Sequence, residues 1–414
     1  MKHIALLISA AILMMVSVSC EKLDNEGTGE ETGDNPPRYL ELSTKSAEFV
    51  QQGNNFAFEF VDRVNQSEKN DFIISPLSMQ FLLGMLLDGA QGKTAEEICK
   101  VLGYGAGEVE AVNEYCHSMM TQLPNLDKKT KISLANAIFV NRPYTLLNTY
   151  KSTVSKYYQA EVSNLDFSKN ASSLKTINGW CSKNTNGLIP KVLNSVDPTA
   201  LAYLLNALYF KSEWSNPFPK ANTAKEPFTL ENGNVKKVPM MKNNITAYAQ
   251  ENDDCTVIQL LYGNGVYSMQ VILPAQGKKL TDVTAAIKAK GWSNYFPALV
   301  SCDVDLWLPK FETKYEKDLN DILSDMGMPS AFSPAADFKA MSNSALCLSF
   351  VKQDAIIKVD EEGTEAAAVS MAGMVGMAFI SGQHIVFHAD RPFLYLITEN
   401  STGAILFAGK YSGK

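Results

Sequence analysis

One uncharged stretch near the C-terminus constrains the fold most, because nothing between Glu365 and Asp390 carries a charge. The stretch from Val359 to Met377 reads VDEEGTEAAAVSMAGMVGM. At the strand period of two, one face holds only small or apolar side chains. These are Thr364, Ala366, Ala368, Ser370, Ala372 and Met374. Its glycines and alanines make it a poor strand by propensity and also fit a helix or a loop. The stretch is therefore a candidate conformational switch.

Composition places the chain among globular proteins. With 414 residues, 46% of them hydrophobic, it is long enough for one large or two ordinary domains. A net charge of -7 without a basic stripe argues against a nucleic-acid partner. Helical patterns dominate the first half and strand patterns the second, without a regular βαβ alternation. This order predicts one mixed α+β domain over residues 43–414.

The N-terminus has the features of a targeting segment. Lys2 precedes an apolar run from Ile4 to Val18, and a small-residue site ends at Cys20. This resembles a bacterial lipoprotein signal, which implies cleavage after residue 19 and acylation of Cys20. Residues 20–42 then form an acidic, flexible linker. We expect a lipoprotein of the cell envelope, held at the outer membrane and displayed on the surface. An ordinary secretory signal and an uncleaved anchor are the alternatives.

Several elements are predicted from local signals. Ser43 to Arg63 has helical spacing of its aromatic residues. Phe72 to Ile74 reads as a short strand, with Ser75 as N-cap and Pro76 at the first position of the next helix. Thr94 and Glu97 have capping-box spacing and predict the start of another helix. The remaining predicted strands are 132–140, 201–210, several within 238–273, 304–311, 385–397 and 404–409, and the remaining predicted helices are 174–185, 280–290 and 318–326.

No catalytic, metal or cofactor site is expected. The motifs of serine hydrolases, phosphate-binding loops, zinc peptidases and dinucleotide-binding folds are missing from the sequence. His384 and His388 flank a strand pattern, so they would lie roughly 13 Å apart and could not share one ion. Besides Cys20, six cysteines remain, widely spaced and mostly in apolar patterns. We expect them to be buried free thiols rather than disulfides.

From NDFIISPLSMQFLLGMLLDGAQGKTAEEI onward the chain resembles the serpin family. The segments INGWCSKNTNGLIPKVL, LLNALYFKSEW and FHADRPFLYLI agree with it, and the resemblance extends from about residue 43 to the end. It implies an α+β fold of three β-sheets, about nine helices and an exposed reactive loop. A target serine protease, or a papain-like cysteine protease, would cleave this loop and form a covalent acyl complex. The loop would then insert into the main sheet, so the protein would be a monomeric inhibitor and not an enzyme.

The resemblance also assigns the candidate switch. Its first part matches the inhibitory hinge of the family, namely Glu361, Glu362, Gly363, Thr364, Glu365, Ala366, Ala367 and Ala368. Small residues suit this role because an inserting strand must bury alternate side chains in a packed sheet. Family spacing puts the scissile bond between Met377 and Ala378, with Phe379 or Ile380 as alternatives. An apolar residue there predicts elastase-like, chymotrypsin-like or subtilisin-like targets.

The resemblance implies two further groups of functional residues. The shutter, where the main sheet parts, matches Ser75, Ser78, Asn206 and Gln353, and the breach, where the loop enters, matches Trp214, Lys310 and Glu361. Lys310 and Glu361 would form an ion pair. Gln353 replaces the usual histidine, which predicts a shutter without the pH response of histidine. The competing functions are a serpin-fold binding protein without inhibition and an unrecognised hydrolase.

Overall fold

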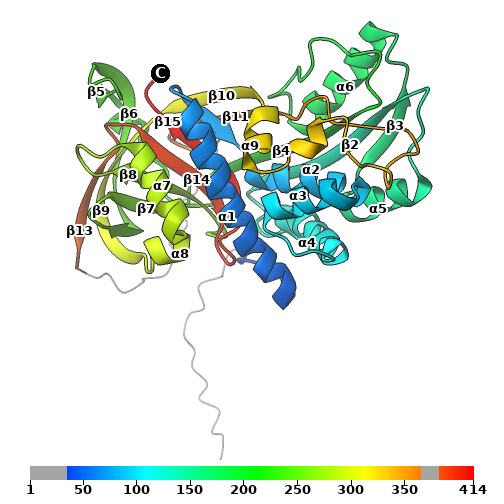
Figure 1. Ribbon diagram of the computed structural model, residues 1–414. Coiled ribbons are helices and arrows are strands. Elements are labelled where there is room, and N and C mark those ends of the chain that lie inside the picture. The colour runs from blue at the N-terminus through cyan, green and yellow to red at the C-terminus, as the bar shows by residue number, and fades with distance from the viewer. Residues whose placement is uncertain (1–34, 365–381) are drawn as a thin grey trace, which may run out of the picture. The chain divides into compact units, whose positions relative to one another are not determined.

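Two hydrogen-bonded sheets carry the fold in a computed structural model that describes residues 35–364 and 382–414 (Figure 1). The larger sheet has the order β1-β15-β14-β8-β7-β6-β9-β13, with β5 paired to β6. Its strands are β1 (Phe72–Ile74), β5 (Ala224–Thr229), β6 (Val235–Glu251), β7 (Cys255–Tyr262), β8 (Tyr267–Pro274), β9 (Val300–Pro309), β13 (His384–His388), β14 (Phe393–Glu399) and β15 (Ile405–Tyr411).

The smaller sheet has the order β10-β11-β12-β4-β2-β3. Its strands are β2 (Lys131–Asn141), β3 (Glu161–Leu165), β4 (Ala202–Glu213), β10 (Phe311–Asp318), β11 (Lys352–Val359) and β12 (Gly363–Thr364). The three expected sheets are connected into two because β6 is one long strand. Its last residues pair with β7, whereas residues 240–249 pair with β9.

Nine α-helices lie within the described residues and pack around these sheets (Figure 1). They are α1 (Thr44–Ser67), α2 (Pro76–Gly89), α3 (Gly92–Leu102), α4 (Val109–Gln122), α5 (Asn148–Tyr158), α6 (Asn170–Asn184), α7 (Leu280–Lys290), α8 (Trp292–Tyr295) and α9 (Asn320–Met326). None of the described helices is both long and apolar enough to cross a bilayer.

Helix α2 lies at the centre and is buried on almost every side. As predicted, Ser75 caps it by accepting a hydrogen bond from Ser78 N–H, and Pro76 occupies its first turn. The predicted start of α3 at Thr94 was wrong, because that helix begins at Gly92. The Thr94 hydroxyl instead accepts a hydrogen bond from Asp337 N–H at 2.9 Å. A tertiary partner has replaced the local capping box.

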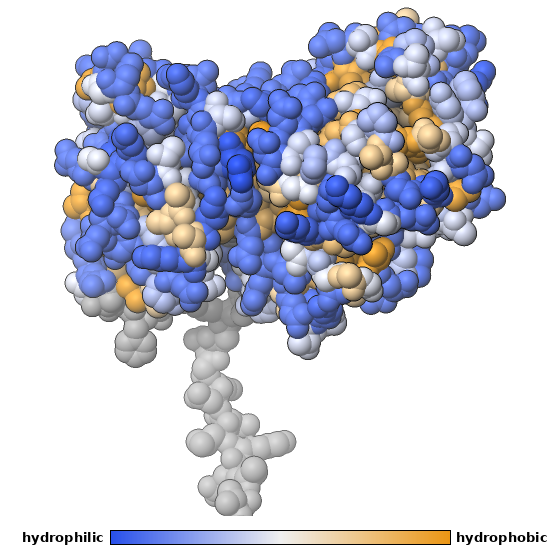
Figure 2. Space-filling view, in the orientation of Figure 1, coloured by the Kyte–Doolittle hydropathy of each residue, from blue (hydrophilic) through white to orange (hydrophobic). Residues whose placement is uncertain are grey.

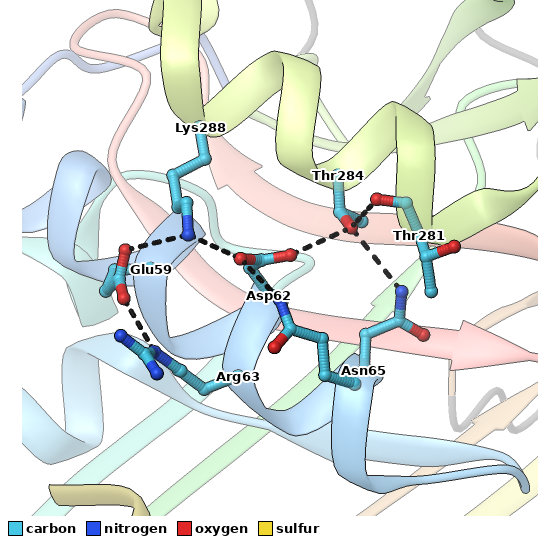
Figure 3. A network of polar contacts seen from close by, with 8 residues as sticks. Glu59, Asp62, Arg63, Asn65, Thr281, Thr284 and Lys288 are labelled. Carbon is cyan, nitrogen blue, oxygen red and sulfur yellow. Dashed lines mark hydrogen bonds and ion pairs between the residues drawn. The ribbon is translucent and has the colours of Figure 1, made fainter. Parts of the chain in front are cut away.

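A polar network joins α1 to α7 (Figure 3). Asp62 is 1% exposed, and its carboxylate lies 2.5 Å from Lys288 Nζ. Thr284 Oγ1 donates to the other carboxylate oxygen at 3.4 Å, and Glu59 contacts Lys288 at 3.3 Å. The hydrogen bond to Asp62 raises the pKa of Lys288. A buried carboxylate paired in this way fixes how α7 lies on α1.

The strand predicted over 385–397 is two strands, β13 and β14, because the chain leaves one edge of the larger sheet and returns to an inner position between β15 and β8. His384 and His388 are the ends of β13. Five of the six cysteines are buried as free thiols, as expected. Cys347 is exposed, because it lies in an irregular segment before β11. The face in Figure 2 is mostly hydrophilic, and apolar residues gather over the half that carries β2 and α6.

Candidate functional site

An open strand position divides the smaller sheet between β4 and β11. Each of these strands pairs on its outer side, β4 with β2 and β11 with β10. Among the described residues they are joined only through the two-residue strand β12 at one end. Below β12, three small cavities of about 20, 50 and 90 Å³ follow one another between the two strands. We call this open position the slot.

The cavities follow the two strands in register. The first is lined by residues 208–210 of β4 and 356–358 of β11, and the second by 204–208 and 352–355. The third continues to residues 201–205 and 346–352. Residue numbers therefore increase in the same direction on both strands. A strand entering the slot would be antiparallel to both, as β12 already is.

Strand β12 holds the first part of the predicted hinge at the top of the slot. Thr364 is opposite Val359 on one side and Ser212 on the other, and Gly363 is opposite Glu213. A Cβ atom on Gly363 would lie only 2.2 Å from the carbonyl oxygen of Ser212. Only glycine permits this close approach of two backbones.

The predicted breach residues meet beside β12. Lys310 Nζ lies 2.7 Å from Glu361 Oε2, and Thr223 Oγ1 donates to Glu361 Oε1 at 2.9 Å. Trp214 bonds to the backbone on both sides of Glu361. Its indole N–H donates to the carbonyl of Asp360 at 2.9 Å, and its backbone N–H donates to Glu362.

The electrostatics of Glu361 depend on these contacts. The carboxylate is 5% exposed, and burial alone would raise its pKa. The hydrogen bonds from Lys310 and Thr223 outweigh burial and hold the pKa below its usual range. Glu361 is therefore ionised at neutral pH and anchors the start of the hinge.

The predicted shutter residues gather at mid-length of the slot. Gln353 makes two bonds to one residue, because its Oε1 accepts from Ser75 N–H at 3.1 Å and its Nε2 donates to Ser75 O at 3.0 Å. Across the slot, Ser78 Oγ donates to Asn206 Oδ1. The Asn206 amide donates in turn to Asn136 Oδ1 at 2.7 Å. These hydrogen bonds connect α2 to both strands that border the slot.

Three contributors to this region were missed from the sequence. Tyr262 stacks on Trp214 with ring centroids 4.4 Å apart, and its hydroxyl lies 2.5 Å from Thr364 Oγ1. Thr223 and Asn136 complete the contacts of Glu361 and Asn206. No local signal marks these residues, because each acts through a partner far away in the chain.

The rest of the predicted loop lies outside the described residues. This applies to Glu365 and to the three alanines Ala366, Ala367 and Ala368 of the hinge. It also applies to the predicted cleavage site, Met377, Ala378, Phe379 and Ile380. Within the described ranges, no group of three or more metal-binding side chains occurs.

Comparison with known proteins identifies the family. The model of the family described as "Serpin (serine protease inhibitor)" matches residues 51–413. The chain belongs to the serpin family. Leukocyte elastase inhibitor of Xenopus laevis is 34% identical over 377 residues, which cover 86% of this chain and 97% of that protein.

Solved serpin structures share the fold. The thermophilic serpin tengpin in its native state matches with a TM-score of 0.79 at 28% identity, covering 92% of this chain and 97% of that one. Thyroxine-binding globulin in complex with thyroxine matches with a TM-score of 0.78 at 28% identity, covering 88% and 98% of the two chains. The family is one of protease inhibitors, and the expected α+β serpin fold is confirmed.

Proposed function

We propose that this serpin is a suicide-substrate inhibitor of proteases that acts by inserting its cleaved loop into the slot. The observation that carries the proposal is the open strand position with the hinge residues Gly363 and Thr364 paired at its top. After cleavage, the loop N-terminal to the cut would fill the position between β4 and β11. The protease, attached through an acyl bond, would move with it.

The register of β12 indicates which loop side chains would be buried. Thr364 is 2% exposed and faces the core, so residues two, four and six positions further on would face the same way. Each step of two along the loop moves two residues back along β4 and along β11. Continued from Thr364 opposite Ser212, this register would place Ser370 between Asn206 and Gln353. A small hydroxyl would then meet the polar shutter.

Insertion would release considerable free energy. An added strand of roughly a dozen residues makes about ten ladder hydrogen bonds, each worth about 0.5–1.5 kcal/mol net. The gain is on the order of 10 kcal/mol before side-chain burial. The uncleaved protein would therefore be kinetically trapped rather than at its free-energy minimum.

The target is proposed from the loop sequence. Cleavage between Met377 and Ala378, or next to Phe379 or Ile380, presents an apolar residue to the protease. No Arg or Lys occurs between Lys358 and Arg391, which disfavours trypsin-like enzymes. A relative named leukocyte elastase inhibitor agrees with this choice. We therefore expect an elastase-like, chymotrypsin-like or subtilisin-like serine protease.

Incubation with pancreatic elastase tests the proposal. We expect a covalent complex that survives boiling in detergent, and a released C-terminal fragment whose mass fixes the cut bond. Thr364→Arg is the matched control, because a charged side chain cannot be buried beside Tyr262. That variant should be cleaved without forming a complex. Clean cleavage of the wild type with no complex would instead support a binding protein without inhibition, and turnover of a small substrate would support a hydrolase.

We also propose that the protein is anchored to a bacterial membrane by lipid on Cys20, with the residues between Cys20 and Asn35 as the tether. The support is the signal-like sequence before Cys20 and the acidic segment after it. Acyl chains contribute about 0.8 kcal/mol for each buried CH₂ group. Expression of the full chain and of Cys20→Ala in a bacterium tests this. The wild type should fractionate with outer membranes and the variant should not; equal distribution would refute the anchor.

A further inference from the structure

The segment 35–42, which the sequence suggests is linker, is attached to the serpin domain. Asn35 Nδ2 donates to Asp127 Oδ1 at 2.6 Å, and Lys128 N–H donates back to Asn35 Oδ1 at 3.0 Å. Leu40 and Leu42 are partly buried against the main core. This end of the segment is therefore part of the folded domain.

Asp127, which receives Asn35, is a buried junction that is 2% exposed. Besides Asn35, its carboxylate accepts from Thr130 Oγ1 at 2.6 Å and from Lys129 N–H at 2.9 Å. Asn264 N–H approaches it at 3.4 Å. The carboxylate thus connects the segment 35–42 to two different parts of the fold.

The first connection leads to the hinge through β4. Thr130 Oγ1 lies 2.6 Å from Ser212 Oγ, and both side chains are at least nine-tenths buried. Ser212 is the residue of β4 that pairs with Thr364. A continuous path of hydrogen bonds therefore runs from Asn35 to β4, at the residue that pairs with Thr364 of the hinge.

The second connection leads to the other side of the hinge. The turn after β7 packs on Asp127 so closely that a Cβ atom on Gly263 would lie 1.9 Å from the carboxylate. The residue before this turn is Tyr262, whose hydroxyl contacts the Thr364 side chain. Asp127 thus supports both the backbone partner and the side-chain partner of Thr364.

We propose that the segment 35–42 is a latch that holds the hinge in place through Asp127. While Asn35 is docked, Ser212 and Tyr262 are fixed and β12 stays paired. When the segment is displaced, both supports of Thr364 loosen and the hinge moves more freely. The effect on loop insertion rests on the proposed function, whereas the coupling itself does not. Since the same segment leads back to Cys20, the membrane tether and the hinge would share one connection.

Hydrogen–deuterium exchange on the full-length protein tests the latch without using inhibition as a readout. Asn35→Ala should speed amide exchange at residues 209–214 and 360–364 by about threefold to tenfold, the effect of losing one or two hydrogen bonds. Asn294→Ala is the control, because that exposed asparagine makes only a local bond, to Lys290 O. Its exchange in both segments should equal that of the wild type.

A second variant cuts the path further along. Thr130→Val removes the bonds of the hydroxyl to Ser212 and to Asp127 Oδ2, but keeps Asp127 Oδ1, the atom on which Asn35 docks. If both changes act on one path, the increase in the amide exchange rate of the double variant should be smaller than the product of the increases in the two single variants. Unchanged hinge exchange in a folded Asn35→Ala protein, or fully independent effects, would overturn the latch. Altered exchange in a protein that forms no complex with elastase, chymotrypsin or subtilisin would refute inhibition and leave the latch standing.

Discussion

Gln353 shows how one side chain sets the chemistry of the shutter. Its amide both accepts from and donates to the backbone of Ser75. It does not titrate, so this pair of bonds is independent of pH. The adjacent residue Asp354 does titrate at mildly acidic pH, because burial raises the pKa of its carboxyl group to about 6. Any acid response of the wild-type slot at mildly acidic pH therefore belongs to groups such as Asp354.

Gln353→His should introduce a new pH response. Below about pH 6.5 the imidazolium only donates, so Ser75 N–H would lose its acceptor and a charge would be buried. Burial lowers the pKa of a histidine in the folded state, so its stabilisation is present at high pH and lost as pH falls. We expect conversion of the variant to the inserted form to accelerate between about pH 7 and 5 relative to the wild type. Native gel electrophoresis of heated samples measures this rate, and parallel pH curves would contradict the prediction.

Lys310→Met should loosen the hinge at neutral pH. It removes the ion pair of Glu361 and leaves a nearly buried carboxylate with Thr223 as its side-chain partner. Because the lysine side chain is 41% exposed, solvent screens the pair, and truncating it costs on the order of 1–2 kcal/mol, less than for a fully buried pair. Because the pKa of Glu361 is lowered in the wild type, its contribution is lost only as pH falls through that lowered value. In the variant, the hydrogen bond from Lys310 no longer offsets burial, so the pKa of Glu361 should be higher than in the wild type. The stabilising contribution of Glu361 should therefore be lost at a higher pH.

The rate of spontaneous loss of inhibitory activity, measured from pH 4 to 8, checks this prediction. Lys314→Met is a suitable control, since its lysine pairs with Glu312 on the exposed face of β10. Equal rates for the wild type and Lys310→Met at neutral pH would show that the ion pair does not restrain the hinge.

Strand β12 is the element on which the site depends. It is only two residues long, yet among the described strands it alone pairs with both β4 and β11. Its position is stabilised by contacts outside the sheet, namely Glu361 with Lys310 and Thr364 with Tyr262. An element this short has little stability of its own, so its surroundings determine whether it forms.

Gly363→Ala should expel β12 from the sheet. The new methyl carbon would lie 2.2 Å from Ser212 O and 2.8 Å from Glu213 Cα, and both are backbone atoms that cannot move aside. We expect faster amide exchange at Thr364 and a larger fraction of loop cleavage without complex formation. Gly179→Ala is the matched control, because nothing lies within 4 Å of the added carbon in α6. Normal complex formation by Gly363→Ala would mean that β12 is not required.

For the whole molecule, the slot implies that the cleaved protein is more stable than the intact one. Nicking between Ala372 and Ile380 should raise the melting temperature by at least about 10 °C, given a release on the order of 10 kcal/mol. Differential scanning calorimetry before and after limited elastase treatment measures the change. Nicked Thr364→Arg should melt like its intact form, because its loop cannot enter. An unchanged melting temperature for the nicked wild type would remove the basis for insertion.

Local sequence chemistry was sufficient for much of the fold. The cap at Ser75, the proline that follows it and a helix that begins near Ser43 depend on neighbours a few residues away, and the structure has them as predicted. The serpin motifs supplied the topology, which no local pattern contains. The predicted start of α3 failed because Asp337, far along the chain, bonds to Thr94.

The site itself depends on contacts that no local pattern reveals. Pairing of Thr364 with Ser212, stacking of Tyr262 on Trp214 and docking of Asn35 on Asp127 each join residues far apart in the chain. The packing of whole strands brings these pairs of residues together. The residues adjacent to each of them in the sequence do not determine which partner it meets. The sequence therefore indicated a candidate switch, through the small and uncharged side chains of one segment. Only the folded sheet showed that Gly363 and Thr364 lie between β4 and β11, and which contacts hold them there.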